Sequence, residues 1–337
     1  MSQPAPSPVL IFDLLTGYQK TAALRAAIEL DLFTLLGEEP RSAAALAEQC
    51  RASEKGVRCL CDSLVVWGLL VRSEGNYALT PDSALFLDRR SPACMADAAE
   101  FLDSPTLRSA YERLTEAVRR GGTALEETGG TMATDHAVWV RFARGMAALM
   151  AMPAQAIPEI VGLPAEAPLR VLDLAAGHGL FGLGFARRHP RAQIVAQDWE
   201  AVLAVAQENA EGAGVADRYT LLPGSAFDVD YGSDYDVVLL TNFLHHFSPS
   251  TCDTLLRRVH AALKPGGVAV TLEFVPDEDR LTPPGPASFS LVMLATTAEG
   301  DAYTFAELDA MFRAAGFGES RAHQLAGGAS TVIVTAR

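Results

Sequence analysis

Cysteine, basic charge and long apolar runs are all scarce in this sequence, and each shortage excludes a class of function. Five cysteines in 337 residues form no pair of closely spaced pairs, and no His/Asp cluster has the spacing of metal ligands. We therefore expect no metal centre, and reduced thiols of the kind found in the cytoplasm. With 27 Lys and Arg against 41 Asp and Glu, the net charge is −14, which argues against nucleic acid or an anionic membrane as the partner.

Signals for membrane insertion or export are also missing from the sequence. No uninterrupted apolar run is long enough to span a membrane. The first residues, MSQPAPSPVL, lack the basic and apolar parts of a signal peptide. We therefore expect a soluble, cytoplasmic protein.

The sequence is rich in apolar residues, and their pattern suits two domains. At 337 residues, 49% of them hydrophobic, the chain is long enough for two cores. Near the N-terminus, Ser42 and Ser53 are placed as helix N-caps, and two short strands flank a Gly/Asn turn. The expected helices cover about 9–36, 43–49 and 54–67, and the expected strands 69–71 and 77–79. Helices followed by such a wing are typical of a winged-helix domain.

DNA binding is the obvious function for a winged helix, but the charges of this region argue against it. Residues 1–90 hold nine Lys or Arg and eleven Asp or Glu, so no basic face is available for phosphates. A structural role in pairing two subunits fits better. We therefore expect a homodimer formed through this domain.

The stretch over 92–165 reads as mostly helical, broken by two glycine pairs. Its last part carries aromatic and methionine side chains at helical spacing; these are Trp139, Phe142, Met146, Leu149, Met150 and Met152. Such a stripe is read either as ordinary core packing or as the adaptable roof of a pocket for a large apolar substrate. The sequence alone leaves both interpretations open.

From Leu169 onward strands and helices alternate, which is the pattern of a doubly wound parallel sheet. Strands are expected over 169–174, 193–198, 218–222, 235–240 and 268–274, with helices near 180–189, 200–212, 250–263 and 304–315. Two last strands, 320–325 and 330–336, are joined across 326–329 and predict an antiparallel hairpin.

The segment RVLDLAAGHGLFGLG, Arg170–Gly184, carries the clearest sign of a ligand site. A buried strand enters a turn of small residues and then a helix, which predicts backbone N–H groups facing a crevice at the carboxyl end of the sheet. The G-x-G-x-x-G spacing admits a dinucleotide, and S-adenosylmethionine is the second candidate. Asp198, after the next strand, suits the ribose of either ligand. Asp173 favours S-adenosylmethionine, because a carboxylate attracts its ammonium group and repels a pyrophosphate. The C-terminal hairpin also fits the sheet of methyltransferases that use this cofactor.

Several motifs occur in one order along both domains: ALRAAIELDLFTLL, SAAALAEQC, GNYALTPDSALFL, FARGM, VLDLAAGHG, QDWEAVL, FLHHFSPSTCDTLLRRVHAALKPGG, VTLEFVP and YTFAELDAMFRAAGF. Together they resemble the class I small-molecule O-methyltransferases of the caffeate and hydroxyindole type, including bacterial natural-product members. The resemblance implies an α/β fold with a Rossmann-like class I methyltransferase sheet and a C-terminal antiparallel hairpin, plus an N-terminal, mainly α, winged-helix dimerisation domain. The implied domains are 1–95 for dimerisation, 96–165 as a helical region lining the substrate, and 166–337 for binding S-adenosylmethionine.

Residue roles are implied where this sequence matches the family's motifs. His245 falls on the general base that takes the proton of the acceptor hydroxyl, and Glu273 on the carboxylate that orients it. The residues implied to bind the cofactor are Asp173, Ala175, Gly177 and Gly179 at its methionine part, Asp198 and Trp199 at its adenosine, and Ser225, Ala226 and Phe227 near its adenine. The residues implied to contact the acceptor are Phe142, Met146, Met150, His246, Phe289 and Met293. Their thioether and aromatic side chains indicate a flat, largely apolar acceptor.

Three positions depart from the family's pattern. Ser225 replaces an acid, His246 stands where the family often has Asp, and Ala302 stands where a second catalytic carboxylate usually precedes Thr304. The neighbouring Asp301 is expected to point elsewhere. Because a fold does not guarantee a reaction, alternatives stay open: transfer to carbon or nitrogen, a non-methylating relative, a ligand-sensing DNA-binding regulator, or a nicotinamide oxidoreductase.

The function that the sequence favours is S-adenosylmethionine-dependent O-methylation. The acceptor would be a hydroxyl of a small aromatic or polyketide-like molecule, and S-adenosyl-L-homocysteine would be the second product. The sequence names neither the acceptor nor the atom that is methylated.

Overall fold

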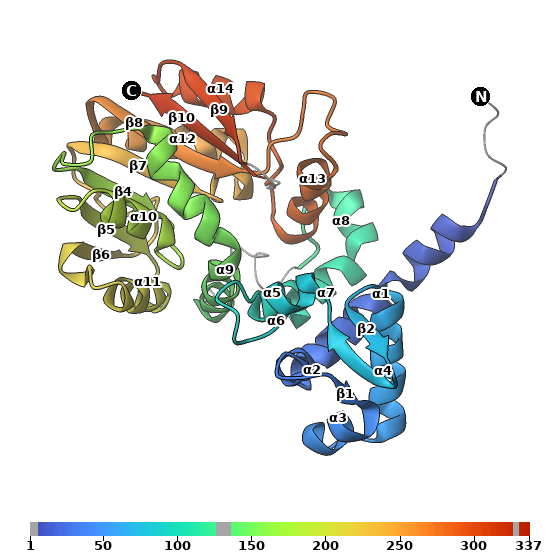
Figure 1. Ribbon diagram of the computed structural model, residues 1–337. Helices are drawn as coiled ribbons and strands as arrows, with labels where there is room; N and C mark the ends of the chain where they lie inside the picture. The colour runs from blue at the N-terminus through green and yellow to red at the C-terminus, as the bar shows by residue number, and fades with distance from the viewer. Residues whose placement is uncertain (1–5, 126–135, 326–329) are drawn as a thin grey trace, which may run out of the picture. The chain divides into compact units, whose positions relative to one another are not determined.

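The chain divides into two compact units, Met1–Ser104 and Pro105–Arg337, in a computed structural model that describes residues 6–125, 136–325 and 330–337 (Figure 1). The stretch 96–165 is shared between them. Helix α6 (Ala96–Leu102) belongs to the first unit, and α7 (Pro105–Glu112), α8 (Leu114–Arg120) and α9 (His136–Val161) belong to the second. Within the described residues, no helix is both long and apolar enough to cross a membrane.

The first unit contains the helices and the wing that the apolar spacing predicts. Its helices are α1 (Val9–Glu29), α2 (Leu32–Leu36), α3 (Ala43–Cys50), α4 (Glu54–Val66), α5 (Pro81–Phe86) and α6. The hydroxyls of Ser42 and Ser53 cap α3 and α4, as predicted, by accepting hydrogen bonds from backbone N–H groups in the first turn. The helix expected over 9–36 is instead two helices, because Asp31 takes a left-handed conformation (φ 55°) between α1 and α2.

The wing is a small antiparallel sheet. Strands β2 (Leu70–Ser73) and β3 (Asn76–Leu79) pair as predicted, and the two-residue strand β1 (Arg41–Ser42) adds a third strand beside β3. Strand β1 is too short to leave a periodic pattern in the sequence, which explains why it was not predicted.

The second unit is built on a seven-stranded sheet in the order β6-β5-β4-β7-β8-β10-β9. Its strands are β4 (Arg170–Leu174), β5 (Gln193–Asp198), β6 (Tyr219–Pro223), β7 (Tyr235–Thr241), β8 (Leu263–Glu273), β9 (Ser320–Gln324) and β10 (Thr331–Ala336). The first five are parallel, and β10 runs antiparallel to both β8 and β9, so the predicted hairpin is confirmed. Strand β8 begins five residues before the predicted 268, because Leu263 already pairs with Tyr235 ahead of a shift in register. The connection 326–329 lies outside the described residues.

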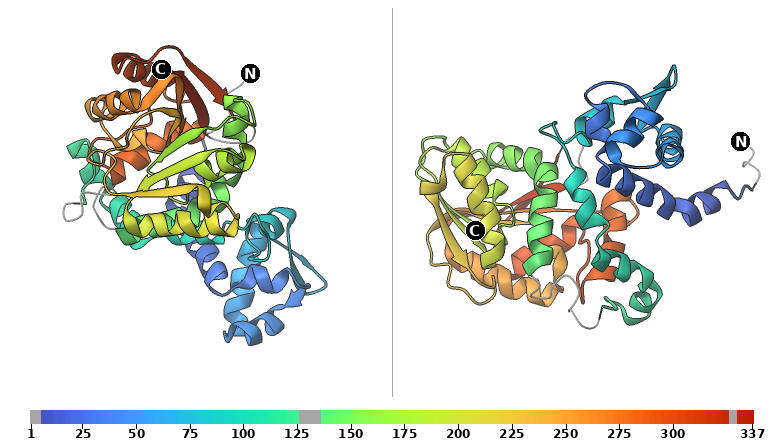
Figure 2. Two further views of the ribbon diagram at one scale, coloured as in Figure 1. Left: turned by 90° about the vertical axis from the view of Figure 1, so that its left-hand side faces the viewer. Right: turned by 90° about the horizontal axis from the view of Figure 1, so that it is seen from below.

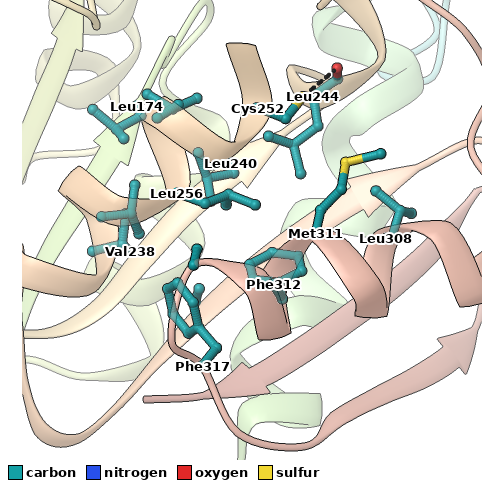
Figure 3. Packing of buried hydrophobic residues seen from close by; sticks show 14 of the residues in the cluster. Leu174, Val238, Leu240, Leu244, Cys252, Leu256, Leu308, Met311, Phe312 and Phe317 are labelled. Atoms are coloured by element: carbon teal, nitrogen blue, oxygen red, sulfur yellow. Dashed lines mark hydrogen bonds between the residues drawn. The ribbon is translucent and has the colours of Figure 1, made fainter. Parts of the chain in front are cut away.

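Helices cover both faces of this sheet (Figure 2). Alternate strand residues belong to two separate cores. Leu172, Leu174 and Leu240 pack with side chains of α12 (Pro249–Ala262) and α14 (Phe305–Ala314), as Figure 3 shows for Leu174, Leu240 and Phe312. Val171, Val237 and Leu239 pack on the other face with α9 and α10 (Leu180–Arg188). Because both faces are covered, the carboxyl ends of the strands are where this sheet meets a ligand.

Candidate active site

The turn between β4 and α10 has the unusual backbone that its small residues predict. Ala175, Gly177 and Gly179 all take left-handed conformations, with φ of 52°, 56° and 70°. The carboxylate of Asp198, at the end of β5, accepts hydrogen bonds from the N–H of Gly177 at 2.8 Å and of Trp199 at 2.7 Å. Asp198 therefore ties the turn to the start of α11 (Glu200–Gly212).

Asp173 lies beneath this turn and is fully buried. Its Oδ2 accepts a hydrogen bond from the N–H of Gly182 at 2.9 Å, and its Oδ1 is buried without a hydrogen-bond partner among the described residues. The pKa of this carboxyl is raised to about 7, mainly by burial and to a lesser extent by the nearby charge of Asp198, while the hydrogen bond from Gly182 opposes the rise. A buried acid with one unbonded oxygen therefore lies at the start of the turn between β4 and α10.

Gln197 joins two turns at this edge of the sheet, and sequence reasoning missed it. Its buried side chain accepts from the N–H of Ala175 at 3.3 Å and donates to the carbonyl of Gly224 at 2.5 Å. The N–H of Gly224 in turn donates to the carbonyl of Asp198 at 3.0 Å. A glutamine directly after the apolar run Ile194–Ala196 was the signal available in the sequence.

The three residues expected near an adenine differ in their surroundings. The hydroxyl of Ser225 accepts from the N–H of Phe227 at 3.1 Å, while the Ala226 side chain is buried in the core. The ring of Phe227 packs edge-on against Phe247 at 5.0 Å. Trp199 is partly buried against a small cluster that includes Ala143 of α9.

A buried polar pair of the site joins His245 to Glu273. His245 lies in the 3₁₀ turn Leu244–His246 after β7, and Glu273 ends β8, so neighbouring parallel strands bring them together. Nδ1 of His245 is 2.5 Å from Oε2 of Glu273. Oε1 of the same carboxylate accepts from the N–H of Phe243 at 3.2 Å and of Leu244 at 2.9 Å. Both oxygens of Glu273 therefore hold the turn that carries the histidine.

Aromatic rings surround this pair. The Phe289 ring meets the His245 ring edge-on at 4.9 Å and stacks on Phe274 at 4.0 Å. The His246 ring is 4.4 Å from that of His245, and Trp139 of α9 lies edge-on to it at 5.6 Å. Burial, with the neighbouring His245, lowers the pKa of His246 well below its usual value, so this ring is neutral. Its Nδ1 is buried and has no hydrogen-bond partner among the described residues.

The methionine stripe of α9 packs on the sheet. Met150 is a buried member of the core on the α9 face and Met146 packs against that core, which agrees with the core-packing interpretation, while the role as a pocket roof stays a prediction. The sulfur of Met150 also accepts a hydrogen bond from the Asn242 amide at 3.4 Å. Asn242 directly follows β7 with φ 52°, and its buried Oδ1 lacks a partner among the described residues. Sequence reasoning missed Asn242 because its contacts lie far along the chain.

Other expected acceptor residues lie on two helices. Phe142 packs edge-on against Trp139 at 5.6 Å on α9, and Met293 is buried on α13 (Pro284–Thr296), which also carries Phe289. A cavity of about 560 Å³ borders α13 as well and is lined in part by Gly121, Glu299, Gly300 and Asp301. The residues of α13 that line it are Ala287, Ser290, Leu291 and Leu294. From the helical repeat, these residues lie on a different face from Phe289 and Met293.

Position 302, where the family usually has a carboxylate, holds a fully buried alanine. The Asp301 carboxylate points away from His245 to Arg280, whose Nη1 is 3.3 Å from Oδ2. Glu273 is thus the carboxylate that the His245 ring contacts.

Comparison with known proteins identifies the family. The profile of the O-methyltransferase domain matches residues 111–318, and that of the O-methyltransferase dimerisation domain matches residues 12–89. The chain belongs to the O-methyltransferase family. This O-methyltransferase is an enzyme that depends on S-adenosylmethionine.

The enzyme is similar to known proteins over nearly the full length of both chains. It is 31% identical to the tetracenomycin polyketide synthesis 8-O-methyl transferase of Streptomyces glaucescens, over 94% of this chain and 93% of that one. A solved structure from Nostoc punctiforme, assigned to the O-methyltransferases, has 49% identity and a TM-score of 0.94, covering 99% and 100% of the two chains. Human N-acetylserotonin methyltransferase, solved with S-adenosylmethionine, shares the fold at 24% identity and a TM-score of 0.86, covering 100% and 99% of the two chains.

The turn of this O-methyltransferase fits S-adenosylmethionine better than a dinucleotide. Its backbone donors are already bonded within the protein, contrary to the free N–H groups that the sequence predicts. These are the N–H groups of Ala175, Ala176, Gly177, Gly179 and Leu180. Because these donors are occupied, they are not available to a pyrophosphate. The carboxylate of Asp173, which has one unbonded oxygen, suits a ligand with a positive charge.

Proposed function

We propose that this enzyme methylates a hydroxyl of a small aromatic or polyketide-like molecule, with His245 as the general base. S-adenosylmethionine, when bound, supplies an electrophilic methyl group. A hydroxyl attacks well only as it loses its proton, and Nε2 of His245 would accept that proton. The observation that carries the proposal is the 2.5 Å contact of Nδ1 with Glu273, because it fixes the tautomer that leaves Nε2 free and stabilises the imidazolium that forms.

The neighbouring His246 is a poorer base. No carboxylate is bonded to its ring among the described residues, and its lowered pKa means that it holds a proton weakly. We therefore assign proton transfer to His245 and contact with the acceptor to His246. Phe142, Met146, Met150, Phe289 and Met293 would complete the acceptor site, and their chemistry favours a flat apolar molecule.

The cofactor would lie at the turn after β4. Asp198 would bind its ribose and Trp199 its adenosine, and Ser225, Ala226 and Phe227 would lie near the adenine. Ala175, Gly177, Gly179 and the buried Asp173 would hold its methionine part. What supports this is the left-handed backbone of the turn, where side chains are small, together with the acid under it.

The acceptor class rests on the aromatic surroundings of His245 and on the relatives. One relative acts in tetracenomycin polyketide synthesis, and another is named for 3-hydroxy-5-methyl-1-naphthoate. Phe289 and Phe274 form a stacked pair beside the base, which suits a fused aromatic ring.

The test is a comparison of His245→Ala with wild type on a panel of hydroxylated naphthoates and polycyclic phenols. Formation of S-adenosylhomocysteine is followed, and NMR of the product shows whether the new methyl group is on oxygen. We expect H245A to lower kcat by about 100-fold or more with cofactor binding kept. His323→Ala, on the edge strand β9, is the control and should retain activity. Unchanged turnover of H245A, or methylation at carbon or nitrogen, would refute the proposal.

A further inference from the structure

Arg280 lies in the loop between β8 and α13, and its guanidinium binds four oxygen atoms at once. Nη2 contacts Oε1 and Oε2 of Glu307 at 2.5 and 2.6 Å. Nη1 contacts Oδ2 of Asp301 at 3.3 Å and the carbonyl of Ala302 at 3.2 Å. The loop that begins directly after Glu273 is thus fastened to the segment 301–302 and to the first turn of α14.

That segment holds the main chain of His245. The N–H of Asp301 donates to the carbonyl of His245 at 3.0 Å. Beside it, Gly300 lies so close to the same carbonyl that a Cβ there would overlap it, and the N–H of Gly300 is fixed by Oγ1 of Thr297 at 2.9 Å. Residues 300 and 301 therefore pack directly against the main chain of His245, with their own N–H groups held by hydrogen bonds.

His245 is consequently held at two points. Glu273 binds its ring, and Asp301 binds its carbonyl, while Arg280 connects the loop after Glu273 to the 301–302 segment. We infer that Arg280 is a positioning residue for methyl transfer, acting through residues 300–302 to keep the His245 ring aligned with Glu273 and the acceptor. This inference rests on the proposed role of His245 as the base.

The chemistry of arginine is what this contact requires. One terminal nitrogen of the planar guanidinium donates to both oxygens of Glu307, and the other donates to the Ala302 carbonyl and to Asp301. A lysine ammonium acts as a single point charge and does not present two such nitrogens in a fixed plane. The three side chains are each about 40% exposed, so charge attraction between them is screened by water. The directed hydrogen bonds of the guanidinium are therefore more important here than the charge attraction of the ion pairs.

A matched control exists on the same unit. Arg257 also joins a carboxylate to a backbone carbonyl, with Nε 2.9 Å from Asp253 and Nη2 2.7 Å from the carbonyl of Ala314. Its contacts lie on α12 and at the end of α14, and it bonds neither His245 nor the segment 300–302. Arg257→Met removes a comparable arginine without touching this segment.

The experiment compares Arg280→Met, Arg280→Lys and Arg257→Met with wild type and with His245→Ala. We expect R280M to lower kcat about five- to tenfold with little change in KM for S-adenosylmethionine, because misplacement of a catalytic group acts on the chemical step. R280K should restore part of the loss, and R257M should match wild type. The acid limb of the kcat profile should move to lower pH in R280M, because a misaligned Glu273 stabilises the imidazolium less.

A second readout does not depend on activity. The short bond between Nδ1 of His245 and Glu273 should give a far-downfield proton resonance, which H245A identifies by its loss. We expect R280M, and not R257M, to shift or broaden this resonance. Equal kinetics and an unchanged resonance in R280M would overturn the inference, as would equal losses in R280M and R257M. If R280M shifts the resonance while H245A keeps its turnover, Arg280 does position the His245 ring, but His245 is not the base.

Discussion

The N–H of Gly182 donates to Oδ2 of Asp173 at 2.9 Å, and the same glycine has no room for a side chain. A Cβ at position 182 would come within 3.1 Å of that oxygen and within 2.7 Å of Cγ2 of Ile194. The first turn of α10 can therefore approach β4 closely enough to bond the buried acid only because residue 182 is glycine.

Gly182→Ala is expected to destabilise the protein by about 1–3 kcal/mol, because the added methyl group would push Ile194 and Asp173 away from α10 in a packed core. Urea unfolding measures the loss. Gly212→Ala is the matched control, since a Cβ at position 212 in the last turn of α11 meets no atom within 4 Å. G212A should stay within about 1 kcal/mol of wild type or gain stability. Equal effects of the two substitutions would contradict this account.

The buried acid itself makes stability depend on pH. The pKa of Asp173 is raised to about 7 by burial, while an unfolded Asp titrates near 3.9. Between these values the native state holds a proton that the unfolded state has lost. The stabilising effect of that proton is complete below about pH 4 and is lost as the pH rises to about 7, at up to about 1.4 kcal/mol per pH unit.

Asp173→Asn removes this titration and keeps a similar shape. The free energy of unfolding of D173N minus that of wild type should therefore increase from pH 4.5 to pH 7 and then level off. Urea titrations at a series of pH values measure it, and taking the difference cancels the groups common to both proteins. Parallel curves for D173N and wild type would show that Asp173 is ionised in the folded protein throughout.

Glu273→Gln is expected to disable His245 through its tautomer. Oε1 of Glu273 accepts from two backbone N–H groups, so the amide oxygen of Gln stays on that side and its NH₂ faces Nδ1 of the histidine. Nδ1 must then accept, the ring proton moves to Nε2, and the nitrogen proposed to take the acceptor's proton is occupied. We predict a fall in kcat of about 100- to 1,000-fold with cofactor affinity kept.

Steady-state kinetics and calorimetry with S-adenosylhomocysteine test this prediction. Glu208→Gln is the control, because Glu208 is exposed on α11 and pairs with Arg144 at the surface. An E273Q variant with nearly full kcat would remove Glu273 from the mechanism.

Most helices and strands were predictable from the sequence, because each depends on a pattern of neighbouring residues. Strands buried on both faces leave apolar runs such as Val171–Leu174, and N-caps such as Ser42 leave a serine before a helix. The order of the motifs also placed His245 and Glu273 at the ends of adjacent strands, where the structure brings them together. Features that depend on neighbouring residues, or on the order of motifs, are therefore predictable from the sequence.

The supporting contacts were not predictable, because each joins residues that are distant in the chain. Gln197 reaches Gly224, Asn242 reaches Met150, and Arg280 reaches Asp301. None of these pairs has a periodic signal, since their geometry exists only once the sheet has brought strand ends together. The bonding of the turn's N–H groups within the protein was missed for the same reason.

The first helix offers the last prediction, which concerns pairing of subunits. Seven large side chains of α1 between Val9 and Tyr18 are 61% to 72% exposed, and they include four consecutive residues, so they lie on every side of the helix. A helix that is apolar all round is a buried helix, and the dimerisation profile begins at residue 12. We propose that a second copy of this chain covers α1.

Replacing Leu10, Phe12 and Leu14 together with serine should dissociate the homodimer. Burying each such side chain contributes about 1.5–3 kcal/mol, so losing three raises the dissociation constant by about 1,000-fold or more. Sedimentation and light scattering over a dilution series measure it, with Leu281→Ser, an equally exposed leucine of the other unit, as the control. Because these side chains are exposed in their own unit, circular dichroism should show a folded monomer. A triple variant that stays dimeric at nanomolar concentration would place the pairing surface elsewhere.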